Sequence, residues 1–367
     1  MVCCGLNTSV VDKSLALELA SLTTEDWQKV SKLANLQSVV ALACDGLEAV
    51  ISAYGEVFAE NRKVSAEWWS DFVIEWTGQV FFIENGYNVY AAAIADLARF
   101  YHQNDMPMLL MKGWGLSLDW PIPSHRQTGD IDIFLLGRGG EADQLIKDEL
   151  GVEPKLNEDK HSTFLFQGYS VENHACFIND TVQPSLKALE KFFEDDAVNA
   201  IPTKVNDVEV LLPSVATNAL FLPQHCGNHF VHGEASIRQL CDWACFVRSH
   251  GKEVDWVATK RMAHQAGFYR FLCCLNGIVQ DHLGIHADCL PDWPRNKKLE
   301  ERVLDEILAQ KKPIRLSLAG KVHRYFASAW KYRLVYNSSM LISSFRLAKS
   351  YLRLHNPNAK SIWEKKK

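Results

Sequence analysis

The segment Gly129-Asp130-Ile131-Asp132-Ile133-Phe134-Leu135-Leu136 combines two carboxylates with a run of apolar residues that is typical of a buried strand. In an extended chain, successive side chains alternate between the two faces of a sheet. Asp130 and Asp132 therefore project from one face, while Ile131 and Ile133 point into a core. Two carboxylates on one face form a cradle for a divalent cation, and hard oxygen ligands favour Mg²⁺ or Mn²⁺ over Zn²⁺.

A third acidic residue, Glu172, follows in Tyr169-Ser170-Val171-Glu172-Asn173-His174, whose alternation predicts another strand with Glu172 and His174 on one face. A third carboxylate on a neighbouring strand lets two ions lie about 3.5–4 Å apart, the spacing that clamps both the attacking and the leaving oxygen of a phosphoryl displacement. The three acids together predict a metal-dependent nucleotidyl transfer site.

The elements around these acids predict a mixed sheet flanked by helices. An apolar strand delivers Lys112 and Gly113 to its end, and a short helix after it is stopped by two prolines. The expected elements, in chain order, are a strand over 107–111, a helix over 114–120, a strand over 130–136, a helix over 141–150, and strands over 162–167 and 169–177.

Helical periodicity dominates on both sides of this core. It runs from Leu15 to about Gln103, and after Pro184 it is clearest over 214–229, 235–249 and 255–282. The sequence thus predicts an α+β protein in four parts. These are an N-terminal helical region (1–104), an α/β core (105–212), a helical domain (213–294) and a basic helical C-terminal region (295–367).

Length and composition restrict the class of protein. A chain of 367 residues exceeds one average domain. Its ten cysteines form no CxxC pair and its N-terminus lacks the apolar stretch of a signal peptide, so we expect a reduced, cytoplasmic protein. No segment approaches the roughly 18 uncharged apolar residues that span a bilayer, which argues against integral membrane insertion.

Charge is distributed unevenly along the chain. Residues 295–367 contain 18 Lys or Arg and 5 Asp or Glu, a net charge of +13, and subtraction from the totals of 39 and 44 leaves −18 for residues 1–294. Basic side chains interleaved with aromatic ones suit a phosphate-rich partner such as RNA. The alternative is a solvated basic helical surface that docks on the acidic body.

Three segments, Leu110-Met111-Lys112-Gly113, Arg126-Gln127-Thr128-Gly129-Asp130-Ile131-Asp132 and Val171-Glu172-Asn173-His174, resemble the family labelled uncharacterised nucleotidyltransferase. The resemblance covers most of residues 15–283 and implies the fold of DNA polymerase beta, with a mixed sheet between helical N-terminal and C-terminal flanks. It also implies a nucleoside triphosphate substrate. Asp130 and Asp132 would bind the catalytic ions and the nucleotide phosphates, and Glu172 would complete the metal site and help deprotonate an acceptor hydroxyl.

The turn at Lys112-Gly113 departs from the Gly-Ser pair that most of the superfamily has at this place. The triphosphate would then be held by the charge of Lys112, by the Gly113 amide and by Arg126, with Gly129 and His174 as further nucleotide-binding candidates. Lys112 has an alternative partner in Asp119. The resemblance names no acceptor, so RNA, a protein side chain and a small molecule all stay open, and the sequence does not specify the base or the oligomeric state.

Four other interpretations accompany this prediction. His225 and His229 have the spacing that places two imidazoles on one helix face, but we expect packing or pocket lining rather than zinc, since no clear third and fourth ligand follows. Arg238 and Asp242 fit a helix salt bridge, although the resemblance makes both possible pocket residues. The whole chain could instead be a catalytically inactive scaffold that binds nucleic acid or protein, or a toxin-like transferase.

Overall fold

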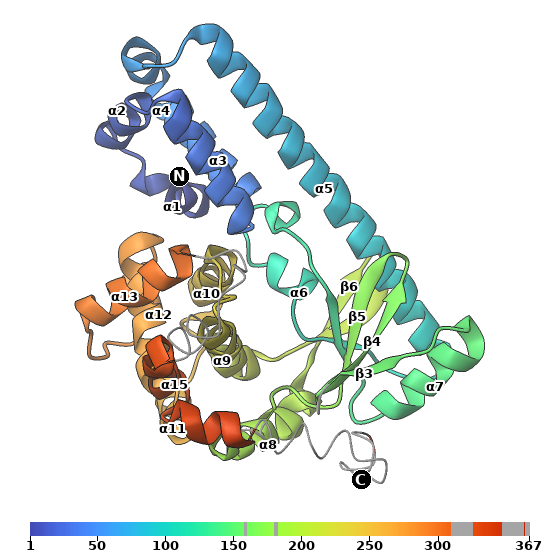
Figure 1. Cartoon of the computed structure of the whole chain (residues 1–367). Coiled ribbons are helices and arrows are strands. Elements are labelled where there is room, and N and C mark those ends of the chain that lie inside the picture. Colours follow the sequence, from blue (N-terminus) through green and yellow to red (C-terminus); the bar gives the residue numbers. More distant parts are fainter. Residues whose placement is uncertain (158–159, 180–182, 310–325, 347–362, 364–367) are drawn as a thin grey trace.

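The computed structural model describes residues 1–157, 160–179, 183–309, 326–346 and 363. In this part of the chain a seven-stranded mixed sheet lies beside a long helix and a group of shorter helices (Figure 1). The predicted α+β class with a mixed sheet is confirmed. The division into four parts stays a prediction.

The N-terminal helices pack around a small aromatic core. Thr23 caps one of them in a reciprocal arrangement with Asp26, which satisfies two backbone N–H groups of the first turn. Trp27 and Trp76 are almost fully buried in the core that these helices share. The helices are α1 (Val2–Leu6), α2 (Lys13–Ala20), α3 (Thr24–Leu36) and α4 (Val40–Asn61).

Helix α5 (Ala66–His102) connects this core to the sheet. Ser65 caps its N-terminus by accepting a hydrogen bond from the Trp68 amide at its hydroxyl, and the helix runs for 37 residues. Figure 1 shows it extending from the N-terminal helices to the far side of the strands. Its C-terminal half packs against the sheet, because its buried residues from Tyr87 to Tyr101 share one hydrophobic core with Ile131 and Ile133.

The sheet places its strands in the order β3-β4-β5-β2-β1-β7-β6. The central pairs are β1 antiparallel to β2, β1 parallel to β7, and β2 parallel to β5. Strand bounds are β1 (Leu109–Leu110), β2 (Ile131–Phe134), β3 (Lys155–Asn157), β4 (His161–Phe166), β5 (Tyr169–His174), β6 (Ile201–Val205) and β7 (Val208–Leu212). Helices α6 (Trp114–Ser117) and α7 (Gly139–Leu150) flank β2 in the chain.

The two faces of β2 turn to different cores, as the alternation predicts. Ile131 and Ile133 pack toward α5, whereas Phe134 belongs to the larger core that the later helices build. Asp132 has the same parity as Phe134. Its carboxylate therefore lies on the face that turns toward those helices.

The later helices form one large hydrophobic core. They are α8 (Lys187–Asp196), α9 (Val215–His232), α10 (Ile237–His250), α11 (Trp256–Ala266), α12 (Tyr269–His282), α13 (Lys297–Leu308) and α15 (Ala329–Tyr336). The continuous helix expected over 255–282 is wrong. Gly267 adopts φ +94°, a conformation that favours glycine and ends α11 before α12 begins.

A second correction concerns residues 201–212, where helical periodicity was expected beyond Pro184. The structure has the hairpin β6–β7 instead, turned by Asn206 and Asp207 with positive φ. Strand β2 is also shorter than predicted, so that Asp130 precedes it and lies in the loop. For the hairpin, the sequence contained a turn signal, because the Asn and Asp at positions 206 and 207 are residues that tolerate the left-handed region in turns.

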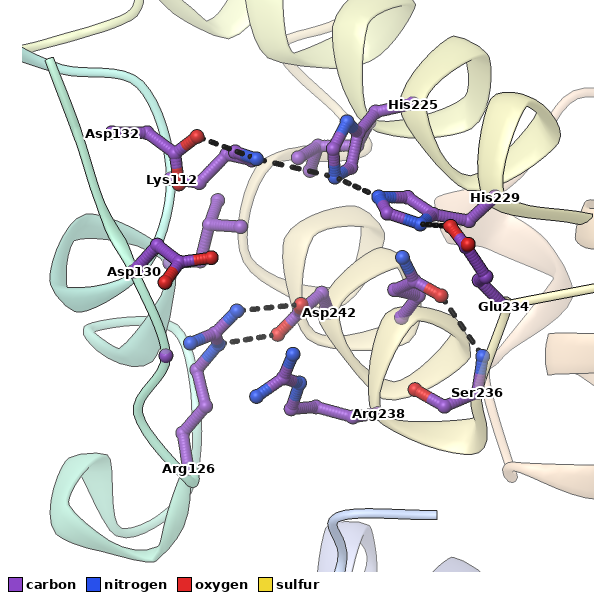
Figure 2. Close-up of a pocket in the computed structure, with 15 residues that line it drawn as sticks. Lys112, Arg126, Asp130, Asp132, His225, His229, Glu234, Ser236, Arg238 and Asp242 are labelled. Atoms are coloured by element: carbon purple, nitrogen blue, oxygen red, sulfur yellow. Dashed lines mark hydrogen bonds and ion pairs between the residues drawn. The ribbon is translucent and has the colours of Figure 1, made fainter. Parts of the chain in front are cut away.

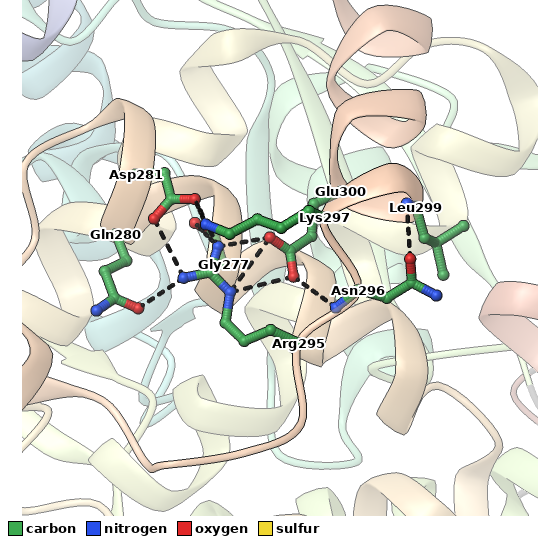
Figure 3. A network of polar contacts seen from close by, with 8 residues as sticks. All are labelled: Gly277, Gln280, Asp281, Arg295, Asn296, Lys297, Leu299 and Glu300. Atoms are coloured by element: carbon green, nitrogen blue, oxygen red, sulfur yellow. Dashed lines mark hydrogen bonds and ion pairs between the residues drawn. The ribbon is translucent and has the colours of Figure 1, made fainter.

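Basic residues at the start of the C-terminal region are paired within the protein. Figure 3 shows Arg295 contacting Asp281 and Glu300, with Nη2 to carboxylate distances of 2.7 and 2.5 Å, so that α12 and α13 are joined. Lys331 of α15 pairs with Glu306 at 2.7 Å and is buried. The Lys331 pair thus lies within the C-terminal region, and Arg295 is the basic residue that pairs with the acidic body. Lys365 to Lys367 lie outside the described residues.

No helix in the described ranges is long and apolar enough to cross a bilayer. The ten cysteines lie within the described ranges and are thiols rather than disulfides, and seven of them are helical residues that lie in or against the hydrophobic cores.

Candidate functional site

Two parallel strands bring the predicted acids together. Strands β2 and β5 pair in a register that sets Asp132 opposite Glu172 and Phe134 opposite His174. Side chains at directly paired positions of neighbouring strands share a face. Asp132, Glu172 and His174 consequently lie in one group on the face turned toward α9.

Asp132 is the buried centre of this group. Its Oδ1 accepts from Lys112 Nζ at 2.7 Å and lies 3.0 Å from His174 Nε2, and only 6% of the residue is exposed. Burial alone would raise the pKa of Asp132, but the charge of Lys112 and the His174 contact hold it well below its usual range. Asp132 is therefore ionised at neutral pH. The alternative pairing of Lys112 with Asp119 is wrong, since Asp119 instead contacts His250.

Asp130 lies at the exposed edge of the same pocket as Asp132 (Figure 2). Among the described residues it forms no ion pair. Partial burial raises its pKa, and the negative charges of Glu172 and Asp132 raise it further. Mutual repulsion of this kind is relieved when a cation binds between the carboxylates.

The backbone around Asp130 is held by α5. Tyr90 donates from its hydroxyl to the Asp130 carbonyl at 2.9 Å. Gly113 sits directly beside this contact with φ +68°, and a Cβ at that position would come within 2.4 Å of the Tyr90 hydroxyl. The position after Lys112 thus requires glycine for both conformation and space.

Glu172 neighbours Asp132 on the same face of the sheet, beside the pocket that Asp130 and Asp132 line. It is not among the residues lining that pocket. Its two oxygens lie 3.3 Å from His174 Nε2 and 3.7 Å from His161 Nε2. Burial raises the pKa of Glu172, but the His174 hydrogen bond outweighs it and the net shift is downward.

Two arginines approach the pocket from the side opposite Lys112. Arg126 makes a two-pronged ion pair with Asp242, with distances of 2.7 and 2.9 Å, and both residues are buried. The helix spacing predicts a salt bridge between Asp242 and Arg238, and this prediction is wrong. Arg238 donates from Nη1 to the Gln127 carbonyl at 2.9 Å, and its buried Nε has no hydrogen-bond partner in the described chain.

The helix α9 supplies a histidine pair at the pocket wall. His225 Nε2 lies 3.5 Å from Lys112 Nζ and 3.1 Å from His229 Nε2, and His229 Nδ1 lies 3.4 Å from Glu234 (Figure 2). Burial and the charge of Lys112 lower the pKa of His225 well below its ordinary value and that of His229 to about 4. Both imidazoles are neutral at pH 7 and line the pocket, as expected.

The resulting cavity of about 190 Å³ is lined mainly by polar and charged side chains. It brings together Lys112, Gly113, Arg126, Gly129, Asp130 and Asp132 of the predicted set. Glu172 and His174 of the predicted set are not part of this lining. The lining carries four carboxylates, one ammonium and two guanidinium groups, and Asp242 is already paired with Arg126. This mixture suits an anionic ligand that arrives with a cation.

The sequence alone did not indicate three contributors. Tyr90 positions the Asp130 carbonyl from a helix far upstream, His161 reaches Glu172 from β4, and Glu234 follows α9. His161 had a usable signal, since it begins the strand that the alternation of residues 162–167 predicted. The other two depend on packing between distant segments.

Comparison with known proteins adds two findings. Residues 23–284 match the family model described as uncharacterised nucleotidyltransferase, a range that contains the whole pocket. A solved structure of an antigenic nucleotidyltransferase-like protein from Paracoccidioides brasiliensis is 13% identical, with a TM-score of 0.34, and covers 54% of this chain and 91% of that one. No curated protein matches the chain.

Proposed function

The chain belongs to the family of uncharacterised nucleotidyltransferases, and on that premise we propose that it transfers a nucleoside monophosphate from a nucleoside triphosphate to a hydroxyl acceptor. In this reaction the acceptor oxygen bonds to the α-phosphorus, the bond to the β-phosphate bridging oxygen breaks, and pyrophosphate leaves. The acceptor proton passes to a base. Positioning and charge neutralisation supply most of the rate in such transfers.

One observation carries the proposal: two carboxylates of the pocket have oxygens available for a cation. The described residues place Lys112 and His174 on Oδ1 of Asp132 and give Oδ2 no hydrogen bond, and they leave Asp130 unpaired. Both side chains face the cavity in Figure 2. This all-oxygen set fits Mg²⁺ or Mn²⁺. When bound, the ion would neutralise the phosphate oxygens.

Arg238 is the group best placed to bind the triphosphate. Its Nε has no partner in the described chain and it lines the pocket beside Asp130, whereas Asp242 already neutralises Arg126. An unmatched guanidinium matches phosphate oxygens in geometry and charge. Lys112 contributes a second positive charge. Because Gly113 has no side chain, its own backbone amide is accessible to a phosphate oxygen. Arg126 then acts chiefly by fixing the loop that carries Gly129.

Glu172 is our candidate for receiving the acceptor proton. It is ionised at neutral pH because its pKa is lowered, and His174 holds one of its oxygens. This arrangement would place the acceptor on the β4–β5 side of Asp132. RNA is one acceptor class, suggested by the charge of +13 in residues 295–367, with a protein side chain or a small molecule as the others.

The second candidate function is a nucleotidyltransferase scaffold without catalysis that binds nucleic acid or protein. The observation that favours it is the ammonium of Lys112 at 2.7 Å from Asp132, which already neutralises the acid that a catalytic ion needs. In that case Lys112 replaces the ion as the structural partner of Asp132.

Label transfer distinguishes the two functions. The protein is incubated with Mg²⁺ and nucleoside triphosphates labelled on the α-phosphate or on the γ-phosphate, together with RNA, protein or small-molecule fractions. Transfer of only the α-label, lost in Asp130→Asn and kept in the exposed control Asp71→Asn, supports the transferase. Triphosphate binding without transfer to any fraction supports the scaffold.

A further inference from the structure

A second group of donor atoms lies on the β4–β5 side of Asp132. His161 of β4 pairs directly with His174 of β5, and Glu172 lies two residues before His174 on the same face. One ligand atom from each of these three residues lies within 4.8 Å of the other two. The Glu172 carboxylate is thus bracketed by two imidazoles.

Hydrogen bonds within the protein leave this group incompletely satisfied. The Nδ1 atoms of His161 and His174 are buried and have no hydrogen-bond partner in the described chain. His174 Nε2 lies 3.0 Å from Asp132 and 3.3 Å from Glu172, yet one N–H donates well to only one of these carboxylates. A cation bound by the two Nε2 atoms would replace the single proton for which Asp132 and Glu172 compete at His174, and each Nδ1 would then carry the proton of its neutral ring.

The spacing of the donors matches a small coordination sphere. A tetrahedral site with bonds of about 2.0 Å has edges of about 3.3 Å. The Glu172 oxygens lie 3.3 and 3.7 Å from the two Nε2 atoms. His161 and Glu172 are partly exposed, with 16% and 23% of their side chains accessible, so an ion has a route from solvent.

We propose that His161, Glu172 and His174 bind a borderline divalent transition metal of the Zn²⁺ class. Two nitrogens and one carboxylate oxygen favour such a cation over Mg²⁺, and three protein ligands leave a fourth position open. This site adjoins Asp132 through His174 but takes no oxygen of Asp130 or Asp132 as a ligand, and an ion there would occupy the Glu172 carboxylate that is proposed above to receive the acceptor proton. It does not depend on the proposed nucleotidyl transfer.

The test is a Zn²⁺ titration of the full-length, chelator-treated protein against a chromophoric competitor, with excess Mg²⁺ present. We expect one equivalent to bind in the wild type, in Asp130→Asn and in the exposed control His264→Gln. Removing a residue that only hydrogen-bonds to a metal ligand weakens metal binding by up to about 100-fold. His161→Ala removes a ligand itself, so we expect it to weaken Zn²⁺ binding by at least about 100-fold. Unchanged affinity in His161→Ala, or loss in Asp130→Asn, would overturn the proposal.

X-ray absorption at the zinc edge of the loaded wild type keeps the test independent of mutant folding. A zinc ion bound by two imidazole nitrogens, with oxygen atoms as its other ligands, would support the site. Zinc bound through sulfur, or displaced by Mg²⁺, contradicts it, as does a protein that binds no zinc. Because none of these readouts involves nucleotide, failure of the transfer proposal would leave the result unchanged.

Discussion

Replacing Lys112 by Met should reveal whether Asp132 is a cation ligand. The Lys112 Nζ to Asp132 Oδ1 distance is 2.7 Å, and the two side chains are 17% and 6% exposed. Breaking a buried pair by removing one partner costs about 3–5 kcal/mol. His174 still contacts Asp132, so we expect the lower end, a loss of about 3 kcal/mol in the free energy of unfolding without metal.

Divalent metal should restore much of that loss. A ligand at 100 times its Kd stabilises the native state by about 2.7 kcal/mol. Removal of the neighbouring ammonium should also tighten Mg²⁺ binding by about tenfold, equivalent to about 1.4 kcal/mol. Mg²⁺ is therefore expected to stabilise Lys112→Met more than it stabilises the wild type.

Urea unfolding with and without Mg²⁺ measures both effects. Lys147→Met is the matched control, because Lys147 is half exposed and pairs with Glu153 outside the pocket. Equal Mg²⁺ stabilisation of the wild type, Lys112→Met and Lys147→Met would refute the reasoning, since Asp132 would then not bind the ion.

Three further predictions concern the framework of the site. Arg126→Met and Asp242→Asn should each cost about 3–5 kcal/mol of stability, whereas the double variant should cost clearly less than their sum; a urea-unfolding mutant cycle showing additivity would contradict the buried pair. Burial acts to lower the pKa of His125, but its contacts with Asp45 and Glu84 raise it above 6.5. The contribution of His125 to the free energy of unfolding is therefore full below about pH 6.5 and is lost as the pH rises through the raised pKa. His125→Gln should reduce the dependence of that free energy on pH, measured by unfolding from pH 6 to 9. Gly113→Ala should destabilise the protein by about 1–3 kcal/mol through strain at positive φ, and an unchanged denaturation midpoint would show that the turn relaxes.

Local patterns in the sequence predicted the core of the fold well. Alternation in residues 130–136 and 169–174 placed Asp132 and Glu172 on faces that the parallel register brings side by side. Such patterns depend on burial on one face of a strand, which the sequence records directly. The hairpin at 201–212 was missed, because its strands are half exposed and carry a weak apolar signal.

The partners of the charged groups were less predictable. Spacing along one helix suggested that Asp242 pairs with Arg238, yet Asp242 pairs with Arg126, 116 residues away. Lys112 likewise reaches Asp132 rather than Asp119. The ion-pair partner of a long side chain depends on how distant elements pack together, and the spacing of residues along one helix does not contain this information.

The central claim is that Asp130 and Asp132 form a cation-dependent nucleotide site. Calorimetric titration of the four ribonucleoside triphosphates, with Mg²⁺ and with chelator, tests it most directly in the wild type, Asp130→Asn and the exposed control Asp71→Asn. We expect Mg²⁺-dependent binding of at least one triphosphate in the wild type and the control, and its loss in Asp130→Asn. Binding that is equal with chelator, or unchanged in Asp130→Asn, would contradict the claim.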